Sequence, residues 1–228
     1  MPLEHQRVLG FLDTMAEPCC RPGDSPRARD PLIEDDIQRS FYSGYFKSHG
    51  LKAQTVLFPD GMTASVFVTS MRASDNGILN MSRLADYLSE IFPVIPGGLG
   101  YRFALWGDGT CQLLPCLLIG RVRGDPTVAQ SAISRRCGAM RTAIEHSCGD
   151  FKNLFKLLDS GKTLRLYNRG NRQVQLIVAS FLIMNCCRCM NGSTCQKIFS
   201  IQAPSIEEYL PLDAVLEPAP SVYIPGRN

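Results

Sequence analysis

Two β-like runs separated by the tripeptide Pro59-Asp60-Gly61 constrain the fold of this chain more than any other feature. Residues 52–58 (KAQTVLF) and 62–69 (MTASVFVT) are rich in β-branched and aromatic residues, which favour strands. An Asp-Gly pair between two such runs is a strong signal for a tight hairpin, and a tight hairpin joins antiparallel neighbours. The sequence therefore predicts an antiparallel strand pair that the other elements must pack around.

Two further strands are predicted, and each of them ends on an acid. Residues 7–13 (RVLGFLD) form a short apolar run that ends at Asp13, and the Pro-, Arg- and Asp-rich residues 18–36 that follow have no periodicity and are expected to be a loop. Residues 101–106 (YRFALW) run into Gly107-Asp108-Gly109. Both acids are thus expected at the carboxyl ends of strands.

Helical spacing of apolar residues occurs in three places. Residues 80–92 carry an apolar stripe, with Asn80 as the expected N-cap and Pro93 at the stop. Residues 126–158 have apolar side chains at steps of three or four, and residues 172–187 are so apolar that we expect a largely buried helix. The order of strand, hairpin, helix, strand and helices predicts an α/β fold with a mixed sheet and flanking helices.

Composition limits the remaining possibilities. A chain of 228 residues with 45% hydrophobic content can bury a full core, so we expect one domain over residues 1–199 and a Pro-rich, disordered tail over residues 200–228. Residues 1–10 lack the apolar centre of a signal peptide and no run of eighteen apolar residues occurs, which indicates an intracellular protein with no membrane partner and with ten reduced cysteines. A net charge of +3 means that any nucleic-acid contact must come from local clusters.

The acids themselves suggest a metal site. Carboxylates are hard oxygen ligands, and a few of them brought together can bind Mg²⁺ or Mn²⁺ while leaving positions for water and phosphate oxygens. Arg141, Glu145 and Lys152 fall on one side of the predicted helix, so a third acid could lie between two cations that contact phosphates. From the pattern alone, Asp13 or Asp108 is more often a solvated cap, and Arg141/Glu145 is more often a surface ion pair.

The chain resembles the catalytic domain of the PIF/Harbinger-type transposases, the DDE superfamily endonuclease group. The matching segments occur in the family's order: RVLGFLDT (7–14), RSFYSGYFKSHGLKAQTVLFPDGM (39–62), SDNGILN (74–80), FALWGDG (103–109), RTAIEHSCGDFKNLFKLL (141–158) and ASFLIMNCCRCMNG (179–192). The most specific parts are the YSG…K.HG.K.Q run and the R…E…CG..K..F helix pattern. The resemblance implies an RNase H-like fold.

The resemblance also implies roles for individual residues. Asp13, Asp108 and Glu145 match the catalytic acid triad, and Asp75 matches an additional acid that is counted among the metal ligands of the family. The implied activity is a two-metal DNA endonuclease or strand-transferase of transposon origin, which uses Mg²⁺ or Mn²⁺ on DNA in the nucleus, with a separate DNA-binding protein or a second copy of the chain as possible partners. The expected phosphate contacts are Lys47, His49, Lys52, Arg141 and Lys152, with a solvated face as the alternative.

Three departures from the family pattern keep a second interpretation open. Ser74-Asp75-Asn76 replaces the family's His-Asp-Ser, and Gly-Thr-Cys follows Asp108 in place of Ser-Gly-Tyr. The helical DNA-binding region that family members carry upstream of the first catalytic strand is missing, so we expect an N-terminally truncated chain. The alternative is a domesticated relic without catalytic activity that binds DNA or a protein.

A zinc site is the remaining alternative. The spacing Cys186-x2-Cys189 is permitted for zinc, and Cys187, Cys195, and either His146 or Cys148, could supply further ligands. No second compact cysteine pair lies at the usual distance, so we favour cysteines packed at the end of a helix.

Overall fold

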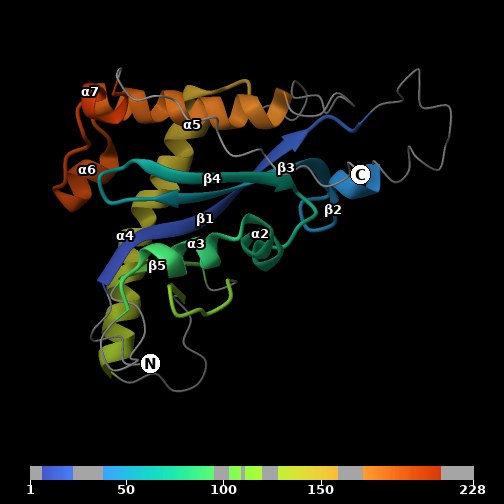
Figure 1. Cartoon of the computed structure of the whole chain (residues 1–228). Coiled ribbons are helices and arrows are strands. Elements are labelled where there is room, and N and C mark those ends of the chain that lie inside the picture. Colours follow the sequence, from blue (N-terminus) through green and yellow to red (C-terminus); the bar gives the residue numbers. More distant parts are fainter. Residues whose placement is uncertain are drawn as a thin grey trace.

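The computed structural model describes residues 7–22, 38–94, 103–108, 111–119, 128–158 and 172–211. Its strands are β1 (Arg7–Cys19), β2 (Tyr42–Ser43), β3 (Ser48–Leu57), β4 (Thr63–Ser70), β5 (Phe103–Gly107) and β6 (Leu117–Ile119). Its helices are α2 (Asp75–Ser82), α3 (Leu84–Ile91), α4 (Val128–Leu154), α5 (Arg172–Asn191), α6 (Thr194–Phe199) and α7 (Ile206–Tyr209) (Figure 1).

The strands form one mixed sheet around β1. β1 pairs antiparallel with β3 on one side and parallel with β5 on the other, and β6 continues the sheet parallel to β5. The outer edge of β3 is shared by β4 and the short β2, both antiparallel to it. This α/β arrangement of a curled mixed sheet with flanking helices agrees with the RNase H-like fold that the resemblance implied.

The predicted hairpin is confirmed. Leu57 of β3 pairs with Thr63 of β4, and the Asp60 carboxylate accepts a hydrogen bond from the backbone N–H of Met62 at 2.8 Å. Gly61 has a φ of 84°, a left-handed backbone conformation that favours glycine. Asp60 and Gly61 therefore form the tight turn that the sequence predicted.

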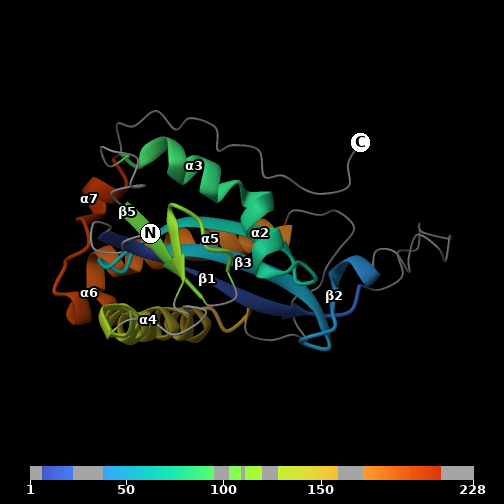
Figure 2. The ribbon, with the colours of Figure 1, turned by 90° about the horizontal axis from the view of Figure 1, so that it is seen from below.

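Helices cover both faces of the sheet. α2 and α3 lie on one face and α4 lies on the other, as Figure 2 shows. Alternate residues of β1 reach these two layers: Phe11 packs in a core cluster with Ile144 of α4, whereas Leu12 packs in a cluster with Leu88 of α3. Because strand side chains alternate, Asp13 belongs to the α4 face and Thr14 to the α2 face.

β1 is longer than predicted. Its pairing with β3 continues through Thr14↔Gln54 to Cys19↔His49, so residues 14–19 are strand and the loop expectation is wrong for residues 18 and 19; residues 23–36 of the expected loop lie outside the described residues. Pro18 is tolerated because β5 pairs only with residues 7–11, which leaves β3 as the one paired neighbour of Pro18 among the described strands. The expectation that Asp13 ends a strand is therefore wrong, whereas Asp108 does follow β5 directly.

The helix predicted over residues 80–92 is in fact two helices. Ser74, rather than Asn80, is the N-cap of α2, because its hydroxyl accepts a hydrogen bond from the Gly77 N–H at 3.1 Å. Arg83, with a φ of 52°, ends α2 and precedes α3, and α3 stops at Ile91, before Pro93, as expected. Ile78 and Leu79 of α2 are buried, so the helix begins early enough to cover the sheet.

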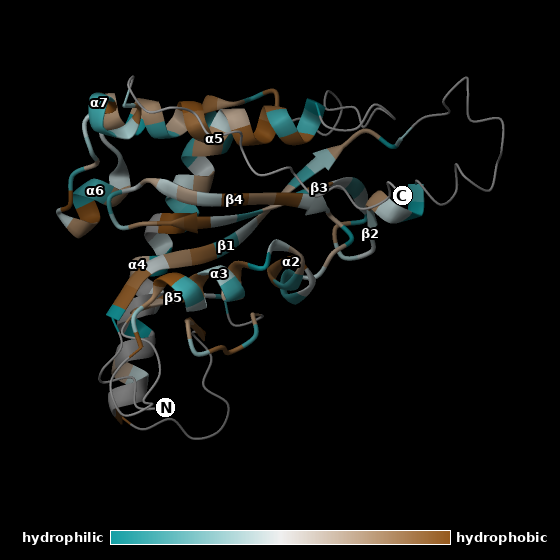
Figure 3. Ribbon diagram, in the orientation of Figure 1, coloured by the Kyte–Doolittle hydropathy of each residue, from teal (hydrophilic) through white to brown (hydrophobic). Residues whose placement is uncertain are grey.

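α4 lies within its predicted range, and α5 begins at the predicted residue but runs on to Asn191. Apolar residues recur along α5 and the central strands in Figure 3. Ile177 and Phe181 of α5 are buried against the core, but Leu182 and Ile183 are each 53% exposed, so the expectation of a largely buried helix is wrong. Among the described residues, one helix, α5, is long and apolar enough to cross a membrane. Helices in the core of a protein meet the same criterion, so this finding is weak evidence.

The chain continues as ordered structure beyond residue 200, where a Pro-rich, disordered tail was expected. α7 begins with a capping box in which Ser205 and Glu208 bond reciprocally, at 3.2 and 2.7 Å. Tyr209 accepts a hydrogen bond from the Asn185 amide of α5 at 2.9 Å, which ties this segment to the body of the protein. The expectation is wrong for α7, and residues 212–228 lie outside the described residues.

Candidate metal centre

The parallel pairing of β1 and β5 sets two of the predicted acids side by side. Phe11 pairs with Trp106, and both side chains lie in the core cluster under α4. Asp13 of β1 and Asp108, the residue after β5, each follow this pair by two residues, so the register gives them corresponding positions. Two acids 95 residues apart in the sequence are thus adjacent because of the strand register.

Arg141 of α4 links the third acid, Glu145, to Asp108. Arg141 lies 2.7 Å from the Asp108 carboxylate through one guanidinium nitrogen and 3.6 Å from the Glu145 carboxylate through the other. Ile144, between them in sequence, is buried against the sheet and holds this part of α4 in place. Arg141 therefore joins the helix acid to the acid that follows β5.

The electrostatics of Asp13 connect it to the same group. Burial raises the pKa of the Asp13 carboxyl, while the hydrogen bond from the Thr14 N–H at 2.9 Å and the positive charge of Arg141 lower it. The negative charges of Asp108 and Glu145 raise this pKa as well. The three acids therefore lie within electrostatic reach of one another, with Arg141 as a shared counter-ion.

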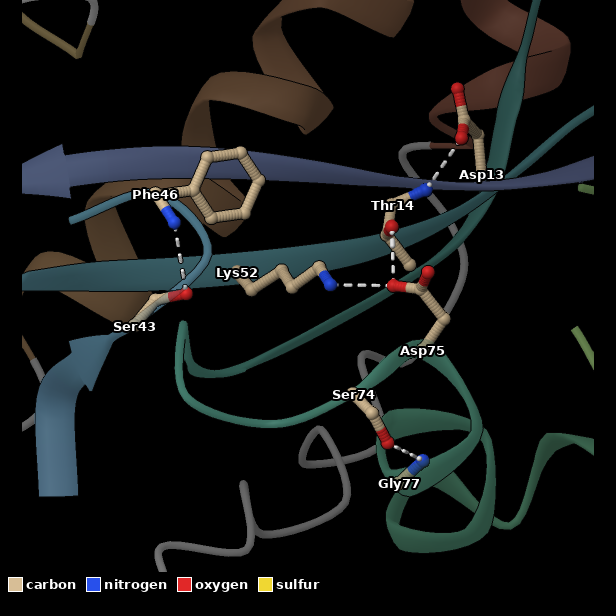
Figure 4. Close-up of polar contacts among 8 residues, drawn as sticks. All are labelled: Asp13, Thr14, Ser43, Phe46, Lys52, Ser74, Asp75 and Gly77. Carbon is tan, nitrogen blue, oxygen red and sulfur yellow. Dashed lines mark hydrogen bonds and ion pairs between the residues drawn. The ribbon is translucent and has the colours of Figure 1, made fainter. Parts of the chain in front are cut away.

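Asp75 lies on the other side of β1, as Figure 4 shows for the labelled side chains. One oxygen of its carboxylate lies 2.5 Å from the Lys52 ammonium and accepts a hydrogen bond from the Thr14 hydroxyl at 2.9 Å. Lys52 and Thr14 both lie on strands, whereas Asp75 is the first residue of α2. The structure therefore does not place Asp75 in the group around Arg141.

A connection between the two sides runs through the residues that follow β5. The N–H of Gln112 donates to the Asn76 side chain of α2 at 2.7 Å, and the N–H of Cys111 donates to the Asp108 carbonyl at 3.0 Å. Burial, followed by the charge of Asp75 and then those of Asp108 and Asp13, raises the pKa of Cys111 to about 11. Asp75 thus borders the acid group without belonging to it.

The donor set fits a divalent cation in its chemistry and charge. Asp13, Asp108 and Glu145 offer hard carboxylate oxygens. Their mutual repulsion, which adds to the larger effect of burial in raising the pKa of Asp13, is the kind that a cation relieves. In the structure, Arg141 supplies the positive charge among these three acids. Among the residues that the structure describes, no three His, Cys, Asp or Glu side chains are gathered closely enough to hold a metal ion.

Comparison with known families adds an independent line of evidence. A family model described as DDE superfamily endonuclease matches residues 18–185, well over half of the chain. The chain belongs to this family. No curated protein and no solved structure matches it.

Membership in the DDE superfamily endonuclease family supports a transposase-type nuclease with DNA as its substrate, and domains of this type generally use divalent metals. The matched range contains Asp75, Asp108 and Glu145 but starts after Asp13. The position of Asp13 in the site therefore depends on the strand register and on its electrostatic coupling to the other two acids.

The residues predicted to contact DNA have different surroundings. Lys47 is exposed in the turn between β2 and β3, with a left-handed φ of 49°. The ring of His49 lies 5.1 Å from that of Tyr42, and burial followed by the charge of Arg21 lowers the pKa of His49. Lys152 is half-buried on α4.

Lys52 and Arg141 are already engaged with acids. The side chain of Lys52 is only 10% exposed and its ammonium is bonded to Asp75, so a role in phosphate contact is no longer supported by its position. Arg141 contacts Asp108 and Glu145 and thus lies inside the candidate site. Among these five predicted phosphate contacts, the exposed side chain is that of Lys47.

The cysteines proposed as zinc ligands do not form a cluster with other ligands in the described residues. Cys186, Cys187 and Cys189 are partly buried on α5, whereas Cys195 of α6 is buried in the core beside Phe11. All nine cysteines that the structure describes are free thiols. The thiols therefore pack at the end of α5 and in the core.

Sequence reasoning missed two polar residues beside the site and one further along β1. Thr14 bonds Asp75, Asn76 bonds the residues after β5, and Glu17 is a fully buried carboxyl on the same face of β1 as Asp13. Extending the first strand through Cys19 would have indicated Glu17, because residues 13, 15, 17 and 19 then share one face. No signal in the sequence indicated the pairing of Thr14 with Asp75.

Proposed function

We propose that this chain is a divalent-metal-dependent DNA endonuclease or strand-transferase of the PIF/Harbinger type, derived from a transposon. The observation that carries the proposal is the convergence of Asp13, Asp108 and Glu145 on Arg141, from two neighbouring strands and a helix. Such a convergence on rigid elements is what a phosphoryl-transfer site requires, because positioning and charge provide most of the catalysis.

The proposed ligands of Mg²⁺ or Mn²⁺ are Asp13, Asp108 and Glu145. When bound, two such ions would supply the charge that activates the attacking oxygen and stabilises the leaving oxygen of an in-line displacement. Arg141 would offset the negative charge of the acids and of a DNA phosphate, and Lys152, on the same helix, would contact the DNA backbone. Asp75 is left out of this set because its oxygen is bonded to Lys52 and Thr14.

The second candidate function is a relic that binds DNA or a protein without cutting DNA. It is favoured by one observation, namely that Arg141 occupies the space among the acids and that no three ligand side chains in the described residues form a metal group. In this case Arg141 is a permanent structural counter-ion. The two candidates differ in whether a metal ion can take over its position.

For either candidate we propose nuclear DNA as the substrate or ligand and a functional domain that runs past residue 199 to include α7, which is bonded to α5. A separate DNA-binding protein, or a second copy of this chain, would supply target recognition. The small net charge supports this division of labour, because a charge of +3 gives little non-specific attraction to DNA.

A nicking assay on supercoiled plasmid separates the two candidates. The wild-type chain should nick the plasmid with Mg²⁺ or Mn²⁺ and not with EDTA. Asp108→Asn should lower the nicking rate by more than the roughly 10–100-fold that loss of an outer-shell partner of a metal costs, because it removes a direct ligand. The matched control is Asp86→Asn, which removes an exposed acid of α3 that pairs with Arg83. Equal nicking by wild type and Asp108→Asn, or no metal-dependent nicking, would exclude the nuclease.

A further inference from the structure

Three aromatic side chains are exposed in and beside the short turn between β2 and β3. We call residues 42–49 the aromatic turn. Tyr45 is 89% exposed, Phe46 is 44% exposed and Tyr42 is 42% exposed. Large rings are usually buried, so a contiguous set of exposed rings marks a surface that a partner covers.

The turn holds its rings in a defined arrangement. The rings of Tyr45 and Phe46 meet edge to face at 4.9 Å, and the N–H of Phe46 donates to the hydroxyl of Ser43 at 3.4 Å. Ser43 is itself buried and pairs with Ser48 of β3, while Lys47 takes the left-handed conformation that closes the turn. A ligand would therefore meet rings that are already ordered, which reduces the entropic cost of binding.

Several cations of the described residues lie near the aromatic turn. Residues 38–59 contain no Asp or Glu, and Arg39 and Lys47 are exposed there. Arg72 reaches the same region by donating a hydrogen bond to the Arg39 carbonyl at 3.4 Å, and Arg21 lies close enough to lower the pKa of His49. Exposed rings between cations match a nucleic-acid strand, whose bases stack while its phosphates pair with the cations.

We propose that the aromatic turn is a binding site for unpaired DNA bases, which stack on Tyr45 and Phe46 while Lys47 and Arg39 contact the flanking phosphates. This proposal rests on the proposed function in so far as the substrate is DNA. The interior of a fully paired duplex cannot offer the face of a base to Tyr45, because its bases are stacked on one another. The site therefore selects single-stranded DNA or a duplex with an unpaired end.

The aromatic turn lies along the same strands as the candidate metal centre. Asp13 pairs with Thr55, and the pairing ends six residues further along β1 with Cys19 and His49. At roughly 3.3 Å per residue, the His49 end of the turn lies about 20 Å from Asp13. A DNA strand with about 3.4 Å per nucleotide covers this span with roughly six nucleotides. An unpaired base near a cleavage position can therefore reach the rings.

The test compares DNA affinities by fluorescence anisotropy in EDTA, so that no cleavage occurs. The probes are a labelled single strand, the fully paired duplex of the same sequence, and that duplex with a single-stranded end. Tyr45→Ala and the double variant Tyr45→Ala/Phe46→Ala should weaken binding of the two probes with unpaired bases by on the order of tenfold or more, and leave the paired duplex unchanged. Tyr87→Ala, which removes a ring that is 60% exposed on α3, is the control and should leave all three affinities unchanged.

Three results would overturn the proposal: equal weakening on paired and unpaired probes, no weakening by the double variant, or no binding of the wild type to any probe. Circular dichroism should show that the variants fold, because the Tyr45 side chain is largely exposed and does not belong to the core. The nicking assay is scored separately. Nicking without base-selective binding removes the aromatic-turn proposal alone, and base-selective binding without nicking removes the nuclease alone.

Discussion

Lys52 and Asp75 form an ion pair on the side of the sheet that α2 covers. Their side chains are 10% and 23% exposed, and Thr14 bonds the same carboxylate oxygen. Removing two charges from water is costly, so such a pair is stable only when hydrogen bonds satisfy both partners. This pair connects β3, β1 and the first turn of α2, where the helix dipole favours an acid such as Asp75. Thr14, which bonds Asp75, follows Asp13 in β1, so the pair lies across β1 from the candidate metal centre.

We predict that Asp75→Asn lowers the free energy of unfolding by about 3 kcal/mol, because it leaves the Lys52 ammonium buried without its counter-charge. Lys52→Met should have a similar effect, and the double variant should lose clearly less than the sum of the two. Urea unfolding at neutral pH measures all three. Strict additivity would show that the two side chains do not interact as the structure has them.

At the scale of elements, the β3–β4 hairpin is held by polar residues of α5. The Asn185 amide donates to the Thr63 carbonyl and its oxygen accepts from the Thr63 N–H, both at 2.9 Å. Arg188 donates to the Gly61 carbonyl and, at 3.3 Å, to the Thr63 hydroxyl. Buried polar groups need such partners, so the hairpin end and α5 specify each other's position. The sheet and this helix consequently behave as one unit.

Gly61→Ala should destabilise the protein by about 2 kcal/mol or more. Gly61 has a φ of 84°, and a Cβ there would lie 2.3 Å from the hydroxyl oxygen of Ser193, so both strain and a clash arise. Gly44→Ala is the matched control, because a Cβ at Gly44 meets no atom within 4 Å and its φ is not left-handed. Thermal or urea unfolding compares the two, and a Gly61→Ala variant as stable as Gly44→Ala would contradict the described turn.

At the scale of the whole molecule, the candidate centre exists only where three elements meet. β1 contributes Asp13, the end of β5 contributes Asp108, and α4 contributes Arg141 and Glu145. All three elements pack in one core cluster, which contains Phe11 of β1, Trp106 of β5 and Ile144 of α4, so the acids remain together despite their repulsion. The folded protein therefore holds three acids close together, and a bound divalent cation would reduce the repulsion between them.

From this we predict that Mn²⁺ or Mg²⁺ raises the melting temperature of the wild-type chain. Binding to the folded state alone stabilises by about 2.7 kcal/mol at a hundred times the Kd. Asp108→Asn and Glu145→Gln should lose most of this gain, whereas Asp86→Asn should keep it. Differential scanning calorimetry with and without EDTA gives the answer, and an identical metal effect in wild type and Asp108→Asn would place the cation elsewhere.

The sequence by itself determined the features that depend on neighbouring residues. The Asp60-Gly61 hairpin, the strand before Asp108, the start of α5 and the mixed α/β class follow from turn chemistry and apolar periodicity, which act over a few residues. Family motifs added Asp13, Asp108 and Glu145 as a group, although their role as metal ligands stays a proposal. These features need no knowledge of what packs against them.

Only the tertiary structure decided where the polar side chains go. The pairing of β1 with β3 extended the strand past Asp13, and strand alternation then sent Asp13 towards Arg141 and Thr14 towards Asp75. The same packing buried Lys52 as the partner of Asp75 and left one apolar face of α5 exposed. Register and burial depend on partners far away in the chain, so a local pattern can identify an acid but cannot show which cation it meets.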